Sequence, residues 1–321
     1  MRLGEPDVGC SASIRTISSN CKENAMPKRD STAQGREFGY SLRGAVRRLG
    51  LTSRELADKA GWDEAKFSDV INGKGGATEV ELGVLFGFCG FGPDERKHLF
   101  RLANTLKCTS WLQSHDGPPI RLRTLEENLV LAKELIVWQA DGVPDLLQSP
   151  AYMRAVIEAS LHESSEDDDP EQRVAGRLEL QRLQRERYQL TCTFYVHEFA
   201  LRLPVGGPEV HAEQLHELLR LSVRKTINIR VVLADAGAHA GMRGPFLQMT
   251  FPAFRPLICV QQENSTLFLE GKAQVDGYNN IIKSLSKHAL SAEASKALIA
   301  QLAKELTVGE GADSETQCQA D

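Results

Sequence analysis

Long apolar runs are missing from this chain. No stretch approaches the roughly 18 consecutive apolar residues of a membrane-spanning helix. The first residues also lack the apolar segment that forms the centre of a secretory signal peptide. Hydrophobic residues make up 41% of the sequence and charged residues 25%, as in ordinary globular proteins. These features predict a cytoplasmic protein without a membrane partner.

Cysteine pairs and metal-ligand motifs are missing as well. The seven cysteines are odd in number, contain no C-x-x-C pair and are scattered over Cys10, Cys21, Cys89, Cys108, Cys192, Cys259 and Cys318. Disulfide and zinc frameworks need closer or paired spacing. The dipeptide His197-Glu198 does not continue as H-E-x-x-H, because position 201 is Leu. His211 and His216 would point roughly 140° apart on a helix. We therefore expect no metal site and no cofactor.

Signatures of catalysis are also absent. The sequence shows no nucleophile elbow, no paired carboxylates and no nucleotide-binding loop. We therefore assign no catalytic residues and expect that the protein is not an enzyme, because turnover would require a site that these motifs do not describe.

The stretch from Leu51 to Gly73 does carry a specific pattern. Thr52 can cap a helix that begins near Ser53, since its hydroxyl accepts from a free backbone N–H. The small Ala57 permits a second helix to cross closely. Gly61 suits the left-handed backbone of a tight turn. The pattern predicts a short helix followed by such a turn.

A second helix is predicted to begin near Asp63. Phe67, Val70 and Ile71 follow the i, i+3, i+4 spacing of a buried helical stripe. Two helices joined in this way form a helix-turn-helix, whose second helix enters the major groove of double-stranded DNA. A helical hairpin that does not bind DNA is the alternative.

Side chains that avoid the buried stripe are the candidates for DNA contact. Lys66 can contact guanine or phosphate, and Glu64 can accept a hydrogen bond from cytosine N4. The base-facing candidates are Ser53, Glu64, Ala65, Lys66, Ser68 and Asp69. The phosphate candidates are Arg43, Arg47, Arg54 and Lys74, because Arg and Lys supply most positioning contacts. The alternative is that these residues form only a solvated face.

An excess of basic charge is missing. The chain has a net charge of −5, and the segment from Glu37 to Ala103 contains ten basic and ten acidic residues. Neutralisation of phosphate supplies most non-specific DNA affinity. A monomer of this segment should therefore bind DNA weakly, which makes dimerisation or a partner protein a natural requirement.

Composition divides the chain into five parts. Residues 1–36 are polar and aperiodic, which predicts a disordered arm, and either Met1 or Met26 is the natural start. Residues 37–106 form the helix-turn-helix domain, with a fourth helix capped by Thr78 and a fifth opened by Pro93. Residues 107–121 read as a linker, 122–308 as a second domain and 309–321 as a disordered tail.

The second domain combines helical and strand patterns. We predict a long helix from Leu122 to Gln139, and a solvated acidic loop at 166–170. Further helices are predicted over 149–161, 171–188, 209–223, 275–288 and 292–306, and strands over 192–197, 227–233, 246–251, 257–262 and 266–269. The fold class is therefore an all-α, phage-repressor-like helix-turn-helix domain followed by an α+β domain.

One glycine-rich segment lies between predicted strands and reads AGAHAGMRGPF, from Ala236 to Phe246. A phosphate-binding loop would need a following helix or a GK[ST] ending, and neither is present. The simplest interpretation is a tight loop in which His239 is held structurally. The alternative is a loop that contacts a partner or ligand through His239, Met242 and Arg243.

Segments of both domains resemble one family. In the first domain the matching segments are 42–43, 50–52, 55–57, 61–62 and 66–68, and in the second they are 143–152, 198–210, 214–219, 236–246 and 289–299. Over about residues 26–306 the chain is similar to actinobacterial XRE-type helix-turn-helix regulators with a large C-terminal domain of unknown function. The WhiJ-like sporulation regulators are members of that family.

This resemblance implies a homodimeric transcriptional regulator. Many relatives are encoded beside a small partner protein, as an antitoxin is beside its toxin, and the second domain would dock that partner or sense a small-molecule ligand. Ser53 stands where the family tends to carry Gln near the start of the first motif helix. In the recognition helix, Asp69 replaces a usual polar or basic residue, and the acidic pair Asp63-Glu64 replaces a commoner Ser-Gln type of start. An antitoxin-like interaction module with weak DNA binding is therefore the alternative. Asp145 and Leu180 depart in the second domain.

Overall fold

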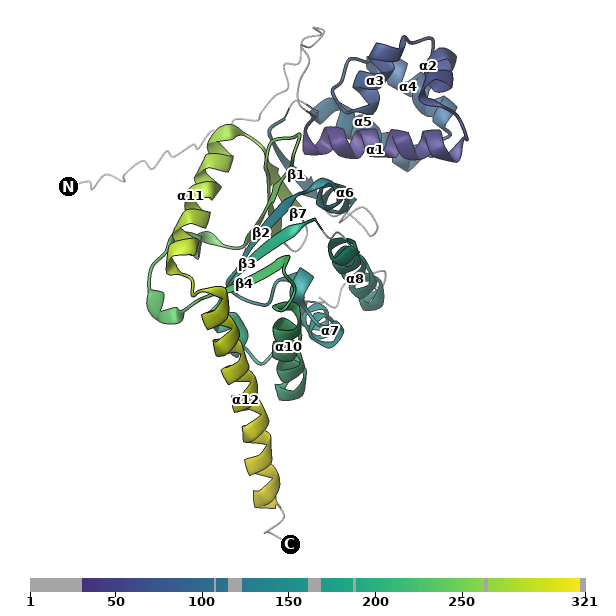
Figure 1. Cartoon of the computed structure of the whole chain (residues 1–321). Helices are drawn as coiled ribbons and strands as arrows, with labels where there is room; N and C mark the ends of the chain where they lie inside the picture. The colour runs from purple at the N-terminus through teal and green to yellow at the C-terminus, as the bar shows by residue number, and fades with distance from the viewer. Residues whose placement is uncertain are drawn as a thin grey trace, which may run out of the picture.

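The computed structural model describes residues 31–106, 108–114, 123–160, 169–186, 189–262 and 265–317. A helical N-terminal domain lies beside a seven-stranded sheet that is flanked by helices (Figure 1). The predicted fold class is thereby confirmed. Residues 166–168 of the expected acidic loop and residues 1–30 of the expected N-terminal arm lie outside the described residues.

The N-terminal domain consists of five helices. They are α1 (Ala33–Arg48), α2 (Ser53–Ala60), α3 (Glu64–Ile71), α4 (Glu79–Cys89) and α5 (Pro93–Thr105). Thr52, Asp63 and Thr78 cap α2, α3 and α4, each by accepting a backbone N–H with its side chain. The predicted caps Thr52 and Thr78 are thus correct, and the second motif helix begins next to Asp63 as predicted. Phe38, Leu42, Leu56, Phe86 and Leu99 are among the buried side chains of this domain's core.

Helix α1 begins at Ala33, inside the segment that the sequence predicts to be a disordered arm ending at residue 36. Thr32 caps the helix by accepting from the Gly35 N–H. The side chain of Arg36 is only 3% exposed and pairs with Glu270 of the second domain. These contacts order the start of α1, and the sequence around residues 33–36 gives no sign of them.

The second domain contains one mixed sheet. Its strands are β1 (Ser110–Ser114), β2 (Glu134–Gln139), β3 (Thr191–His197), β4 (Ile227–Val232), β5 (Phe246–Thr250), β6 (Leu257–Gln262) and β7 (Ser265–Leu269). The order across the sheet is β1-β7-β6-β5-β2-β3-β4. Strands β2, β3 and β4 run parallel, and the other neighbouring pairs are antiparallel.

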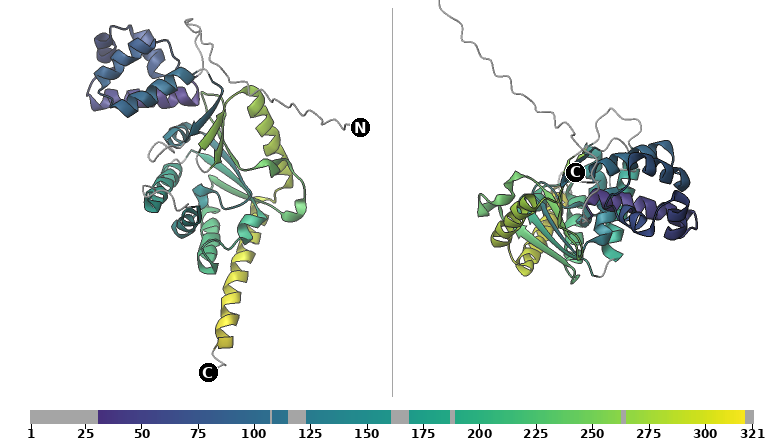
Figure 2. Two further views of the ribbon diagram at one scale, coloured as in Figure 1. Left: turned by 180° about the vertical axis from the view of Figure 1, so that it is seen from behind. Right: turned by 90° about the horizontal axis from the view of Figure 1, so that it is seen from above.

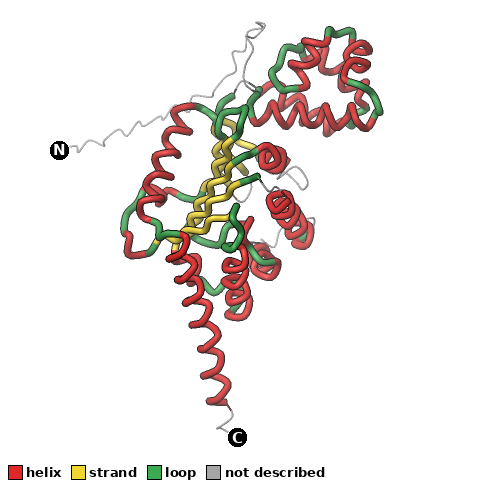
Figure 3. Tube along the Cα trace, viewed as in Figure 1, coloured by secondary structure: helices red, strands yellow, loops and turns green. Residues whose placement is uncertain are grey.

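Helices cover both faces of the sheet. Figure 3 shows α11 (Lys272–His288) on one side and the helices α6 (Arg123–Leu131), α7 (Pro150–Ser160) and α8 (Pro170–Glu186) on the other. Helix α10 (Pro208–Leu221) packs with α12 (Ala292–Gln317), and the short α9 (Glu198–Arg202) follows β3. Two further views place the helical domain at the end of the sheet near β1 and α6 (Figure 2).

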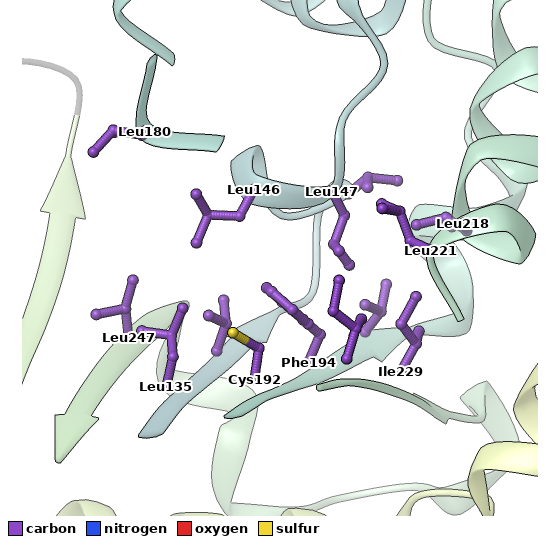
Figure 4. Close-up of a cluster of buried hydrophobic side chains, with 14 of the residues drawn as sticks. Leu135, Leu146, Leu147, Leu180, Cys192, Phe194, Leu218, Leu221, Ile229 and Leu247 are labelled. Atoms are coloured by element: carbon purple, nitrogen blue, oxygen red, sulfur yellow. The ribbon is translucent and has the colours of Figure 1, made fainter. Parts of the chain in front are cut away.

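Alternation along the strands creates two separate cores. Leu135, Cys192, Phe194 and Ile229 point to the larger core, where they meet side chains of the short helix η1 (Asp145–Leu147) and of α10 (Figure 4). Trp138, Tyr195 and Val232 occupy alternate positions and pack toward α11. Successive residues of a strand point to opposite faces, so these strands are buried on both sides.

The long helix predicted from Leu122 to Gln139 is wrong. Helix α6 ends at Leu131, and Glu134–Gln139 form β2, which pairs with both β3 and β5. The segment ELIVWQ is apolar enough for either structure, and its position in the middle of the sheet decides for the strand. Leu135 and Val137 of this strand face one core and Trp138 faces the other. The helical interpretation of the sequence overlooked this alternation.

Two predicted boundaries also differ. The expected linker at 107–121 contains β1, which is antiparallel to β7 and stacks Trp111 on Phe268 with ring centroids 5.3 Å apart. At the other end, α12 continues to Gln317, beyond the start of the predicted disordered tail at residue 309.

Candidate nucleic-acid interface

Helices α2 and α3 have the geometry of a helix-turn-helix. The Thr52 hydroxyl accepts from the Glu55 N–H, while the Glu55 carboxylate accepts from the Thr52 N–H at 2.7 Å. This reciprocal capping box fixes the start of α2. Gly61 ends the helix with φ of 68°, and Ala57 is fully buried. The small residue and the left-handed glycine therefore have the roles that the sequence predicts.

Helix α1 holds the end of α3 through close backbone packing. A Cβ atom at Gly39 would lie 2.2 Å from the Ile71 carbonyl oxygen, and one at Gly35 would lie 2.4 Å from the Gly73 oxygen. The guanidinium of Arg43 donates to the Ile71 carbonyl at 2.7 Å. Arg43 thus caps the C-terminal end of α3. Its predicted phosphate contact would have to coexist with this bond.

The base-facing candidates lie on the surface of the motif. Ser53, Glu64, Ala65 and Ser68 are exposed, and Lys66 and Asp69 are partly exposed. The Asn72 amide donates to the Ser68 carbonyl at 2.7 Å and is exposed at the end of α3. Asn72 was not among the predicted contacts, and its only local signal is its position directly after the helix.

The side chain of Lys66, a residue of α3, is held against α4 by a bond within its own domain. Its Nζ lies 2.5 Å from Glu81 Oε1 on α4 and 4.9 Å from the Trp62 ring centroid. The bond from Lys66, followed by a backbone N–H from Thr78, lowers the pKa of Glu81 to about 2. Glu81 therefore stays ionised, and DNA must compete with it for Lys66. The Lys66–Glu81 contact spans 15 residues of sequence and has no local signal.

Other cations of the motif also face acidic side chains. Arg54 Nε lies 3.1 Å from Glu64 Oε1, and Lys74 Nζ lies 3.9 Å from Asp69 Oδ1. Such exposed pairs contribute little energy and yield to a stronger anion. Arg47 is exposed in the last turn of α1. The positive charge available to phosphate is therefore reduced by neighbouring carboxylates.

A buried ion pair joins the two domains. Arg36 donates to Glu270 Oε1 at 2.8 Å and to Asn128 Oδ1 at 2.6 Å. Its guanidinium also lies 4.7 Å and 4.9 Å from the ring centroids of Phe251 and Phe254. Burial raises the pKa of Glu270, and the charge of Arg36 offsets part of this rise. None of these contacts was predicted from the sequence, because the partners lie far apart in the chain.

A second polar cluster extends the same junction. Glu37 of α1 accepts from the Thr124 hydroxyl of α6 and lies 2.6 Å from His98 Nε2 of α5. Glu270 also accepts from the Ala33 N–H at 3.1 Å. These contacts connect the two domains through α1, the same helix that supports α3.

The glycine-rich loop lies at the carboxyl end of the parallel strands. Trp138 Nε1 donates to the Gly241 carbonyl at 2.8 Å, and the His239 ring lies 5.3 Å from the Trp138 ring. His197 and His288 lie 6.3 Å and 6.2 Å from His239. Burial, and then the charges of these two histidines, lower the pKa of His239.

The three candidate residues of the loop differ in their contacts and exposure. His239 Nδ1 accepts from the Gly241 N–H at 3.1 Å, which agrees with the interpretation of a structurally held histidine. Met242 is 69% exposed and Arg243 is exposed. The latter two therefore remain the residues that a partner or ligand can reach.

Comparison with known families assigns both domains. Residues 122–301 match a family described as a domain of unknown function, DUF5753. The chain belongs to the DUF5753 family. Residues 37–99 match a helix-turn-helix domain, so the DUF5753 domain follows a domain of the class that binds DNA. Searches among curated proteins and among solved structures found no match.

In the part of the chain that the structure describes, no group of three His, Cys, Asp or Glu side chains is arranged to hold a metal ion, and no helix can span a membrane. Burial raises the pKa of Cys192 in the DUF5753 domain, and of Cys89 in the helical domain, to about 11. Both therefore remain protonated thiols at neutral pH.

Proposed function

We propose that this DUF5753 protein is a cytoplasmic, homodimeric transcriptional regulator that recognises a specific DNA sequence through α3. The observation that carries this proposal is the helix-turn-helix itself: α2 ends at the left-handed Gly61, and α3 presents Glu64, Ser68 and Asp69 to the outside while α1 holds its far end. Such a helix fits the major groove. We propose no enzymatic activity and no cofactor.

The DUF5753 domain is proposed to receive the regulatory signal. Support comes from the junction, where Arg36 and Glu37 bond to Asn128, Glu270 and Thr124. A partner or ligand that shifts α6 or the end of β7 therefore acts on α1. As in WhiJ-like regulators, which the chain resembles, we propose a small protein encoded nearby as the partner, with a small molecule as the alternative ligand.

Fluorescence anisotropy on labelled DNA from the region upstream of the gene tests DNA recognition. The expected result is saturable binding whose log affinity falls linearly with log salt, because phosphate contacts release counterions. Unrelated DNA of equal length is the control. Equal binding to both DNAs contradicts sequence-specific recognition. So does the absence of binding to either DNA at low salt, both with and without the neighbouring protein.

A second candidate function is an antitoxin-like interaction module with weak DNA binding. It is favoured by the carboxylates that face Arg54, Lys66 and Lys74. It predicts tight co-purification with a small partner and negligible retention on DNA. The anisotropy experiment separates the candidates, since the regulator binds its own upstream DNA and the module does not.

A further inference from the structure

Helix α4 is apolar on two opposite faces. Leu82, Leu85 and Phe86 point into the core, whereas Val80, Val84 and Phe88 are 78%, 49% and 45% exposed. The exposed three are spaced four residues apart and therefore lie in one strip along the helix. A solvent-exposed helix face is normally polar, and a row of exposed apolar side chains is typical of a protein contact surface.

The surroundings of the strip permit close approach. Gly83 and Gly87 lie beside the three apolar side chains, and a Cβ atom built at Gly87 would meet no atom within 4 Å. Phe100 of α5 reaches Gly83, where its ring lies 3.8 Å from the position of such a Cβ. The apolar surface of α4 thus continues onto α5.

A shallow groove follows on α5. It has a volume of about 550 Å³, and its lining consists of Pro93, Arg96, Lys97, Phe100, Arg101 and Asn104. Its accessible lining is mostly apolar, although three of the lining residues, Arg96, Lys97 and Arg101, are cations. An opposite charge is available at the N-terminal end of the strip, since the exposed Glu79 precedes Val80 in the first turn of α4.

We infer that the face formed by the α4 strip and the α5 groove binds a second copy of this chain. Two copies of α4 pack antiparallel across a two-fold axis, with Val84 near the axis. Glu79 and Val80 of each copy then meet the α5 groove of the other. Every contact occurs twice in such an interface. The face is self-complementary in charge, because it carries both the carboxylate and the cations.

This pairing also fixes the two DNA-reading helices relative to one another. Lys66 of α3 bonds to Glu81 in the first turn of α4, so the position of α4 determines that of α3. A dimer doubles the phosphate contacts of a domain whose own charges cancel. The inference rests on the proposed dimeric DNA-binding function and names its interface.

Sedimentation equilibrium of the full-length protein without DNA tests the inference. Val84→Asp should raise the dimer dissociation constant at least about 100-fold, because the carboxylate enters an apolar contact twice. Val223→Asp is the matched control, since Val223 is 67% exposed but lies outside the strip. It should leave the dissociation constant unchanged. Circular dichroism checks that both variants are folded.

A charge exchange provides an independent arm. Glu79→Lys should weaken the dimer at least about 5-fold, and adding Arg96→Glu and Lys97→Glu in the same chain should restore it, because opposite charges then face each other again. A monomeric wild type at tens of micromolar overturns the inference. A wild-type dimer that Val84→Asp leaves intact also overturns it. The same holds if the strip binds only a different protein.

The dimer and DNA measurements fail separately. A wild-type dimer that Val84→Asp dissociates, but that binds no DNA, supports the interface and removes the proposed function. A monomer that still binds its upstream DNA specifically removes the interface and leaves DNA recognition standing.

Discussion

Arg36 Nη2 lies 2.8 Å from Glu270 Oε1, and this buried ion pair joins α1 of the helix-turn-helix domain to the residue that follows β7. The two side chains are only 3% and 8% exposed. Helix α1 in turn supports α3 through Gly39 and Arg43. A displacement at the end of β7 therefore has a continuous physical route to the helix that is proposed to read DNA.

Breaking this pair should destabilise the protein strongly. Glu270→Gln is expected to lower the free energy of unfolding by about 3–5 kcal/mol, because the Arg36 charge is left buried without its counterion. Urea unfolding followed by circular dichroism measures the change. The double variant Arg36→Met, Glu270→Met should recover part of the loss, since no charge then remains buried.

The control for that experiment is an exposed pair. Lys272 Nζ lies 2.6 Å from Asp276 on α11, and both side chains are more than half exposed. Lys272→Met should change the free energy of unfolding by less than about 0.5 kcal/mol. If Glu270→Gln had as small an effect as this control, the ion pair would have no structural role.

Replacing a glycine inside a helix by alanine usually stabilises a protein, but the contact of α1 with α3 should reverse this effect at Gly39. Gly39→Ala should lower stability by about 1–3 kcal/mol, because the new methyl group overlaps the Ile71 carbonyl. Gly44 is on the same helix, and a Cβ there would meet nothing within 4 Å. Gly44→Ala should instead raise stability by about 0.5–1 kcal/mol. Thermal unfolding of both variants measures the difference, and equal signs contradict the packing.

Carboxylates on the motif are expected to weaken DNA binding. Glu64→Gln should increase the affinity for the upstream DNA, because Arg54 is freed for one more phosphate contact. The slope of log affinity against log salt concentration should then become steeper by about 0.9. Anisotropy titrations over a salt series measure both quantities. Asp235→Asn, an exposed charge of the DUF5753 domain, is the control. If Glu64→Gln instead lowered the affinity for the upstream DNA but not for unrelated DNA, Glu64 would be a base contact.

His239 should remain neutral to an unusually low pH. Its pKa is lowered below the ordinary 6.5 by burial and by His197 and His288. Between the folded and unfolded pKa values the unfolded chain binds more protons, so this contribution to stability is complete above about pH 6.5 and is lost as the pH falls. NMR titration of the imidazole measures the folded pKa. His197→Phe removes one repelling charge, and a further drop in the His239 pKa in that variant would be inconsistent with this cause.

Much of the helix-turn-helix follows from local sequence. The caps at Thr52 and Thr78, the start of α3 near Asp63, the left-handed Gly61 and the buried Phe67 depend on neighbours within a few residues, which is why each was predictable. The alternating apolar positions of β3 and β4 likewise carry their own signal. Such elements need only short-range hydrogen bonds and a consistent buried face.

Other features were decided only by residues distant in sequence. Glu134–Gln139 became a strand because β3 and β5 bracket it, and the start of α1 was ordered by Glu270, 234 positions away from Arg36. Lys66 has the sequence position of a DNA contact, but Glu81 of the next helix holds it. The residue types and spacings specify which groups are available. Their pairing depends on burial and on long-range packing, which only the tertiary structure brings about.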